Sequence, residues 1–148
     1  MKFHGIRGQK VELKIVNYEF PDKNNDEWDD NWLNIYLNVT SEVGNWQTVD
    51  PSLTTCEVGE LINWFETFLQ REKPVLRELS FMEPNLSFEL LDCKSDGLTM
   101  FRIKFDLESR PKSATDDREY FVDCLVDDQE LKQIVENLKT ELEKFLER

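Results

Sequence analysis

Hydrophobic side chains repeat at two different intervals along this chain, and this pattern constrains its fold more than any other feature. Seven segments have the features of β-strands, most of them with an apolar residue at every second position. These segments are residues 11–20, 33–39, 46–49, 79–81, 86–90, 101–107 and 120–126. Apolar residues at intervals of three and four predict helices over residues 54–71 and 127–147.

Both predicted helices begin with a capping signature. Thr54 is followed three positions later by Glu57, so that each side chain can accept a hydrogen bond from a backbone N–H group that the first helical turn leaves free. Asp127 and Glu130 have the same spacing. Asp127 is therefore the expected N-cap of the second helix.

Turn signals separate the predicted strands. The alternation changes phase near Ile15, which predicts a β-bulge there. The pair Asp50-Pro51 is expected to end the third strand, because proline cannot donate a hydrogen bond to a neighbouring strand. Asp96-Gly97 is typical of a tight hairpin and predicts antiparallel pairing of the strands on either side.

These elements predict one α+β domain over residues 1–148. We expect an antiparallel sheet of about six or seven strands with two amphipathic helices packed on it, in the order βββ-α-ββββ-α. The segment 120–126 is apolar on both faces except for Asp123, so it is expected to be a central strand. Trp64 accompanies the apolar face of the first helix and is expected in the core.

The charge is strongly negative. The chain has 31 acidic and 18 basic residues and a formal net charge of −13. This charge argues against sequence-independent nucleic-acid binding, which needs cations on the phosphates, and against binding to anionic membranes. It favours a basic protein partner, although many acidic domains owe their charge to solubility alone.

The residue types give little support for catalysis or metal binding. His4 is the only histidine, and the three cysteines are spaced too widely for a metal site, so each is expected as a small core residue. They are Cys56, Cys93 and Cys124. The loop that begins at Asp22 lacks the glycine and the final glutamate of a calcium loop. No cofactor motif occurs, and no cofactor is expected. The first residues contain no apolar targeting segment, so a cytoplasmic location is expected.

Two acidic segments are candidates for binding a partner. Residues 22–31 contain five acids and one lysine, and residues 116–130 contain seven acids and one arginine. Tryptophan among carboxylates is typical of an interface anchor with a charged rim. The side chains of Trp28 and Trp32 could instead pack beneath the loop. The predicted partner-binding residues are Asp22, Asp26, Glu27, Trp28, Asp29, Asp30, Trp32, Asp116 and Asp117.

Three segments resemble the WapI-like immunity proteins, and the resemblance extends from about Val11 to the last helix. They are FP…DEWDDNWLN at residues 20–34, DPSLTTCE at 50–57 and LSFMEPNLSFE at 79–89. The resemblance implies a bacterial protein that binds and neutralises a toxin domain delivered by a neighbouring cell. Two alternatives remain open. One is a small enzyme that uses carboxylates on an unknown substrate, and the other is a housekeeping interaction protein or homodimer.

Overall fold

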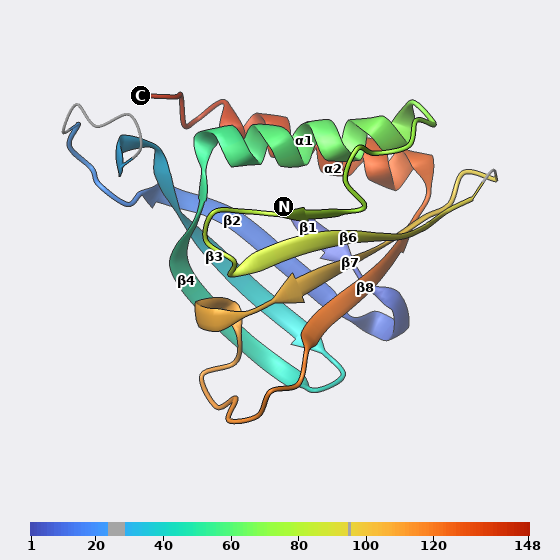
Figure 1. Ribbon diagram of the computed structural model, residues 1–148, viewed down its shortest axis with the longest axis horizontal. Helices are drawn as coiled ribbons and strands as arrows, with labels where there is room; N and C mark the ends of the chain where they lie inside the picture. Colours follow the sequence, from blue (N-terminus) through green and yellow to red (C-terminus); the bar gives the residue numbers. More distant parts are fainter. Residues whose placement is uncertain (24–28, 95) are drawn as a thin grey trace.

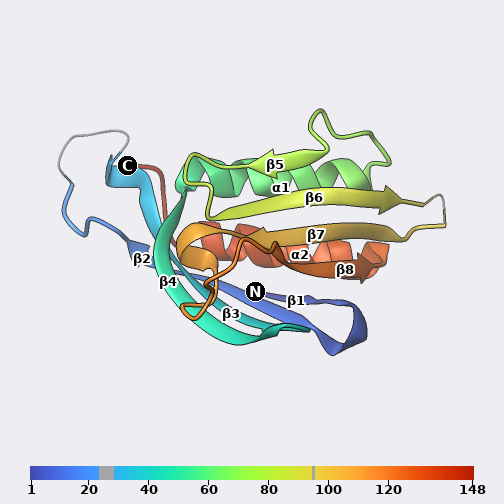
Figure 2. The same ribbon diagram turned by 60° about the horizontal axis from the view of Figure 1, so that its bottom comes forward.

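The computed structural model describes residues 1–23, 29–94 and 96–148, and within these ranges eight strands form two four-stranded antiparallel sheets (Figure 1). The first sheet has the order β1 (Lys2–His4), β2 (Lys10–Tyr18), β3 (Trp32–Ser41) and β4 (Gly44–Thr54). The second has the order β5 (Glu78–Ser80), β6 (Leu86–Cys93), β7 (Thr99–Phe105) and β8 (Tyr120–Val126), as Figure 2 shows.

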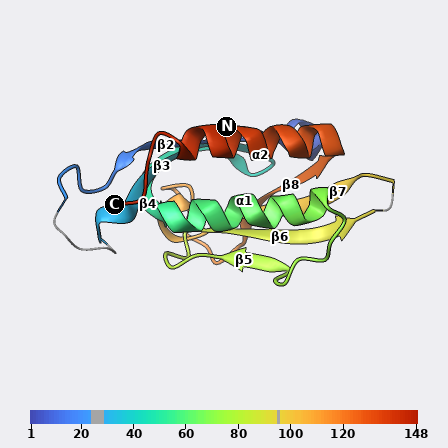
Figure 3. The same ribbon diagram turned by 90° about the horizontal axis from the view of Figure 1, so that it is seen from above.

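Two helices cover both sheets from one side. They are α1 (Thr55–Leu69) and α2 (Asp128–Leu142), and they run side by side in opposite directions (Figure 3). Short 3-10 turns connect other elements: η1 (Ile6–Gly8), η2 (Asp29–Asn31) and η3 (Leu107–Ser109). The α+β class is therefore as predicted.

The expectation of a single sheet of about six or seven strands is wrong. Alternation along a strand indicates which face is buried, but it does not specify which strands pair across an intervening helix. Here α1 separates β4 from β5, and these two strands lie at the outer edges of different sheets. The additional strand, β1, has only three residues and is too short to show a period.

The two sheets meet where the chain leaves β1. Gly5 forms an isolated antiparallel bridge with Cys124 of β8. A Cβ atom on Gly5 would lie 2.6 Å from Cγ1 of Val122 and 2.9 Å from Cβ of Gln9, so only glycine fits this approach. β8 is consequently the last strand of its sheet rather than a central one, and the first sheet covers the edge that it would otherwise expose.

The core lies between the sheets and the helices, and aromatic side chains fill its centre. The ring of Phe65 in α1 lies 6.2 Å from that of Phe3 in β1, 5.9 Å from Phe88 in β6 and 5.1 Å from Phe101 in β7. One helical side chain thus packs against both sheets. Trp64 is buried beside it, as predicted.

The predicted capping boxes and bulge are confirmed, and some boundaries are wrong. Thr54 and Asp127 are the N-caps of α1 and α2, and a register shift separates Ile15 from Asn17 in β2. The helices end at Leu69 and Leu142, earlier than expected. After α1 the chain turns at Arg71, which has a left-handed backbone with φ 58°.

Strand β4 continues past Pro51 to Thr54, contrary to expectation. A register shift places Pro51 opposite Asn34 and Leu53 opposite Leu33, so Ser52 of β4 is the extra residue. Because β4 is an edge strand, the missing N–H group of Pro51 can face away from β3 without loss of a hydrogen bond.

The cysteines differ from the expectation of a shared core role. Cys124 is buried at the joint between the sheets, and burial raises the pKa of its thiol to about 12. Cys56 and Cys93 are exposed, because one lies on the solvent side of the first helical turn and the other near the outer end of β6.

Substitution of Gly5 tests the joint between the sheets. Gly5→Ala should lower the free energy of unfolding by about 1–3 kcal/mol, because the added methyl group overpacks against Val122 and Gln9. Gly59→Ala is the matched control: Gly59 lies in α1 with no atom within 4 Å of the added methyl group. The control should stabilise the protein by roughly 0.5–1 kcal/mol. Equal effects of the two substitutions in denaturant titrations would contradict the close approach at Gly5.

Candidate functional site

Carboxylates from several separate segments surround one hollow on the surface, which we call the acidic hollow. Its volume is about 350 Å³. Its lining residues are Glu19, Phe20, Asp29, Trp32, Asp50, Pro51, Glu83, Asn85 and Glu108. They come from the segment after β2, from η2, β3 and β4, from the connection between β5 and β6, and from η3.

The first sheet forms one wall of the acidic hollow. Strand β3 buries every second side chain from Leu33 onwards, so Trp32 belongs to the set that points away from the core. The backbone N–H of Glu19 donates to the carbonyl of Trp32 at 2.8 Å, which holds the segment after β2 beside the start of β3.

A buried carboxylate anchors the connection that carries Glu83 and Asn85. One oxygen of Glu57, in the first turn of α1, accepts a hydrogen bond from the backbone of Met82 at 2.7 Å. The other accepts from the backbone of Thr54 at 2.8 Å. The capping group of α1 therefore also fixes the connection between β5 and β6 next to the end of β4.

Two hydrogen bonds dock η3 against the other walls. The indole N–H of Trp46 in β4 donates to the carbonyl of Ser109 at 2.9 Å. The backbone N–H of Asp106 donates to the carbonyl of Asn85, also at 2.9 Å. These contacts place Glu108 beside the same hollow as Asp50 and Glu83.

Among the residues that the structure describes, no lysine or arginine lines the acidic hollow. Within the part of the chain that the structure describes, the side chains of Glu19, Asp50, Glu83 and Glu108 form no ion pair. Like charges held together in this way repel one another.

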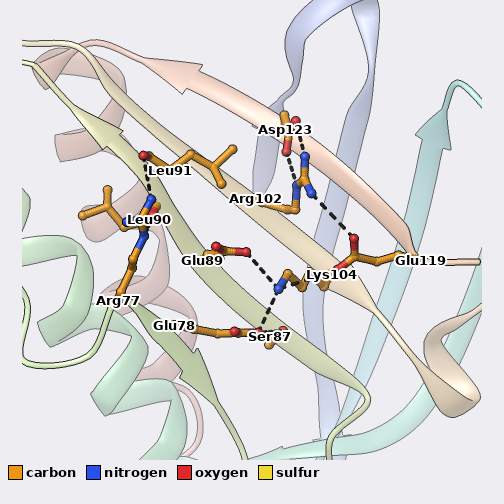
Figure 4. A network of polar contacts seen from close by, with 10 residues as sticks. All are labelled: Arg77, Glu78, Ser87, Glu89, Leu90, Leu91, Arg102, Lys104, Glu119 and Asp123. Atoms are coloured by element: carbon orange, nitrogen blue, oxygen red, sulfur yellow. Dashed lines mark hydrogen bonds and ion pairs between the residues drawn. The ribbon is translucent and has the colours of Figure 1, made fainter.

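On the outer face of the second sheet, by contrast, carboxylates are paired with cations (Figure 4). There the guanidinium of Arg102 binds both carboxylate oxygens of Asp123, at 2.7 and 3.0 Å. The ammonium of Lys104 lies 3.0 Å from Glu78 and 2.9 Å from Glu89. The acidic residues of this face thus have cationic partners, whereas Glu19, Asp50, Glu83 and Glu108 of the acidic hollow form no ion pair within the described residues.

Burial and mutual repulsion raise the pKa of two carboxyl groups in the acidic hollow. For Glu19 the main cause is burial, followed by the charges of Asp29, Asp50 and Glu83. For Asp50 the main cause is again burial, followed by the charges of Glu108 and Glu83. Both groups therefore ionise at a cost in the isolated protein, which a bound cation would relieve.

A second and larger hollow adjoins the first and shares Asp50 and Glu108 with it. We call it the apolar hollow after Val49, Leu107, Pro111 and Ala114; its volume is about 700 Å³. Its walls also contain polar side chains and two cations, Arg110 and Lys112. Val49 is 59% exposed and Leu107 is 52% exposed, so both add apolar surface to this hollow. The backbone of Leu107 is left-handed, with φ 44°, a conformation that side chains other than glycine rarely adopt.

The predicted partner-binding residues between Asp22 and Trp32 do not all lie at one site. Asp29 and Trp32 line the acidic hollow. Asp30 is only 3% exposed, and Asp22 is exposed but lines neither hollow. Asp26, Glu27 and Trp28 lie outside the described residues. Their part in partner binding stays a prediction.

Asp116 and Asp117 line neither of the two hollows. The carboxylate of Asp116 accepts hydrogen bonds from Arg118 at 2.5 Å and from the hydroxyl of Tyr120 at 3.2 Å. Asp117 is exposed. Their charge can still contribute to the field around the protein, and their role in binding also stays a prediction.

Several lining residues have no signal in the sequence that could have identified them as one site. Glu19, Asn85 and Glu108 lie far apart along the chain and come together only because of the sheet topology. Asp50 and Glu83 were distinguishable only as two acids among many.

The described residues contain no group of three histidine, cysteine or carboxylate side chains that could hold a metal ion. In the same part of the chain no helix is long and apolar enough to cross a membrane.

Comparison with known families identifies the family of this chain. The model of the Immunity protein WapI-like family matches residues 2–146. The chain belongs to this family. No curated protein matches it. Membership in the WapI-like family suggests an immunity function and agrees with the resemblance of the three sequence segments.

Neutralising a carboxylate of the acidic hollow should stabilise this WapI-like protein. Asp50→Asn should raise the free energy of unfolding at pH 7 by on the order of 0.5 kcal/mol, the usual size of interactions between partly exposed charges. The raised pKa means that the folded protein holds the proton of the Asp50 carboxyl more tightly than the unfolded chain. Above the folded pKa, the ionised carboxylate therefore lowers the free energy of unfolding, and this is the penalty that Asp50→Asn removes. It disappears as the pH falls through that pKa toward the ordinary value of 3.8.

Denaturant titrations at pH 7 and at about pH 4 measure this effect. Glu72→Gln is the control, because Glu72 is exposed, lines neither hollow and changes the net charge by the same amount. A destabilised Asp50→Asn protein, or a gain no larger than that of the control, would show that the carboxylates do not repel one another appreciably.

Proposed function

We propose that this WapI-like protein gives immunity by binding a toxin domain and blocking it, and that the face with the acidic and apolar hollows makes the contact. The observation that supports the proposal is a concave cluster of carboxylates in a chain of the immunity family. Four of them, Glu19, Asp50, Glu83 and Glu108, form no ion pair within the described residues. A basic partner would supply the missing positive charge, so we infer that the toxin domain is basic at its contact surface.

The arrangement of the two hollows supports binding. Interfaces typically combine a few apolar anchors with a polar, charged rim. Val49 and Leu107 supply exposed apolar surface, and Asp50 and Glu108 lie between this surface and the acidic hollow. The net charge of −13 would also accelerate the approach of a basic domain, an effect that salt weakens.

The small-enzyme hypothesis retains one specific observation in its favour. Glu19 and Asp50 are neighbouring carboxyl groups in a concave site, and their raised pKa values are typical of general acids. Immunity by binding requires no such chemistry, and membership in the WapI-like family favours binding. A homodimer through this face is disfavoured, because two copies would bring uncompensated carboxylates of the same sign together.

Co-expression with candidate toxin domains from neighbouring genes tests the proposal. Cells should survive when both proteins are present, and the two should co-purify at low salt. Continued toxicity despite soluble expression of the WapI-like protein would contradict the proposal. So would survival without a stable complex, which would favour enzymatic protection.

Leu107 provides a test of the contact face. Leu107→Gly removes an exposed apolar side chain at a left-handed position that glycine tolerates, so it should leave the free energy of unfolding nearly unchanged. Its affinity for the toxin domain should fall about tenfold, equivalent to roughly 1.4 kcal/mol, if the side chain is buried in the complex.

Val75→Gly is the matched control, because Val75 is fully exposed in the connection after α1 and lines neither hollow. Titration calorimetry on both variants separates the effects. Equal affinities of the two variants and the unchanged protein would exclude the apolar hollow from the interface.

A further inference from the structure

We propose that the acidic hollow is a socket for the side chain of a single arginine of the partner protein. This inference rests on the proposed function in that it takes the partner to be a protein. It goes further because it names the chemical group that enters the hollow and the residues that recognise it.

The polar side chains around the acidic hollow supply hydrogen-bond acceptors. Glu19, Asp50, Glu83 and Glu108 are carboxylates, which accept hydrogen bonds and do not donate when ionised. None of these four has an ion-pair partner among the described residues. The matching ligand must therefore be rich in donors and positively charged.

Asn85 gives a second and independent indication of a donor ligand. Asn85 lines the acidic hollow and is only 2% exposed. Its Nδ2 donates to the hydroxyl of Ser52 at 3.3 Å, and its backbone carbonyl accepts from Asp106. Its Oδ1 is buried without a hydrogen-bond partner among the described residues. A buried acceptor in this state is costly, and a donor from the ligand would satisfy it.

Aromatic side chains complete the recognition of a guanidinium. Phe20 and Trp32 line the same hollow, and a planar guanidinium stacks favourably on such rings. The protein contains an internal example of this geometry: the guanidinium of Arg102 lies 3.6 Å from the ring centre of Phe121 while it binds Asp123 (Figure 4 shows the ion pair). The guanidinium of Arg148 likewise lies 3.5 Å from the ring centre of Tyr18.

Arginine fits this site better than the other cations. In the ranges that the structure describes, no three carboxylates converge closely enough to hold a metal ion, whereas a guanidinium spreads five donors over a plane. Lysine has a compact charge and cannot reach several separated acceptors at once. The volume of about 350 Å³ is at the lower end for ligand sites and suits one side chain.

Binding of an arginine analogue to the intact protein tests the socket without a toxin. N-acetyl-arginine methylamide should cause saturable NMR shifts of the Trp32 indole N–H and the Asn85 side-chain amide, with a Kd in the millimolar range. N-acetyl-citrulline methylamide has a nearly identical shape without the charge and should leave both signals in place. Asp50→Asn and Glu83→Gln should each weaken binding at least threefold, and Glu72→Gln should not change it.

Four outcomes would overturn the proposal. They are equal shifts with the citrulline probe, equal affinity for N-acetyl-lysine methylamide, tighter binding of calcium ions at the same signals, and shifts that do not saturate. The result is separable from the proposed function. Toxin binding that survives the double change Asp50→Asn and Glu83→Gln refutes the socket and leaves immunity by binding intact. Arginine binding without any toxin complex supports the socket and contradicts immunity by binding.

Discussion

The packing of α1 against both sheets is the constraint on which the rest of this structure depends. Phe65 contacts Phe3 of the first sheet and Phe88 and Phe101 of the second, so one helical side chain packs on both sheets. At the other side Gly5 draws β1 against β8. The sheets are therefore joined where β1 meets β8, and Trp46 of β4 packs directly against Phe105 and Tyr120 of the second sheet. Their connecting segments meet at the surface.

The acidic and apolar hollows form where those segments meet. Glu57 belongs to the core helix and also binds the connection that carries Glu83 and Asn85, while Trp46 holds η3 against β4. A well-packed interior thus fixes the positions of carboxylates that repel one another. On the outer face of the second sheet the acids are paired with Arg102 and Lys104, so the uncompensated charge of the hollow is a local feature and not a consequence of composition alone.

The sequence predicted the local features well, because they depend on neighbouring residues. The capping boxes at Thr54 and Asp127, the bulge after Ile15 and the antiparallel β6–β7 pair follow from short-range geometry. The split into two sheets did not follow, since it depends on packing around Phe65 and on the bridge at Gly5. The same holds for the site: Asp29 and Trp32 were noticed as an acidic, aromatic segment, but only the topology shows that Glu108 lies with them.

Hydrogen–deuterium exchange of the protein alone and in complex with its toxin domain tests the central claim most directly. The account predicts added protection of backbone amides in residues 47–51, 83–86 and 106–112, which carry the walls of both hollows. Protection confined to the solvent side of α1 and α2, or to the outer face of the second sheet, with these three segments unchanged, would contradict it.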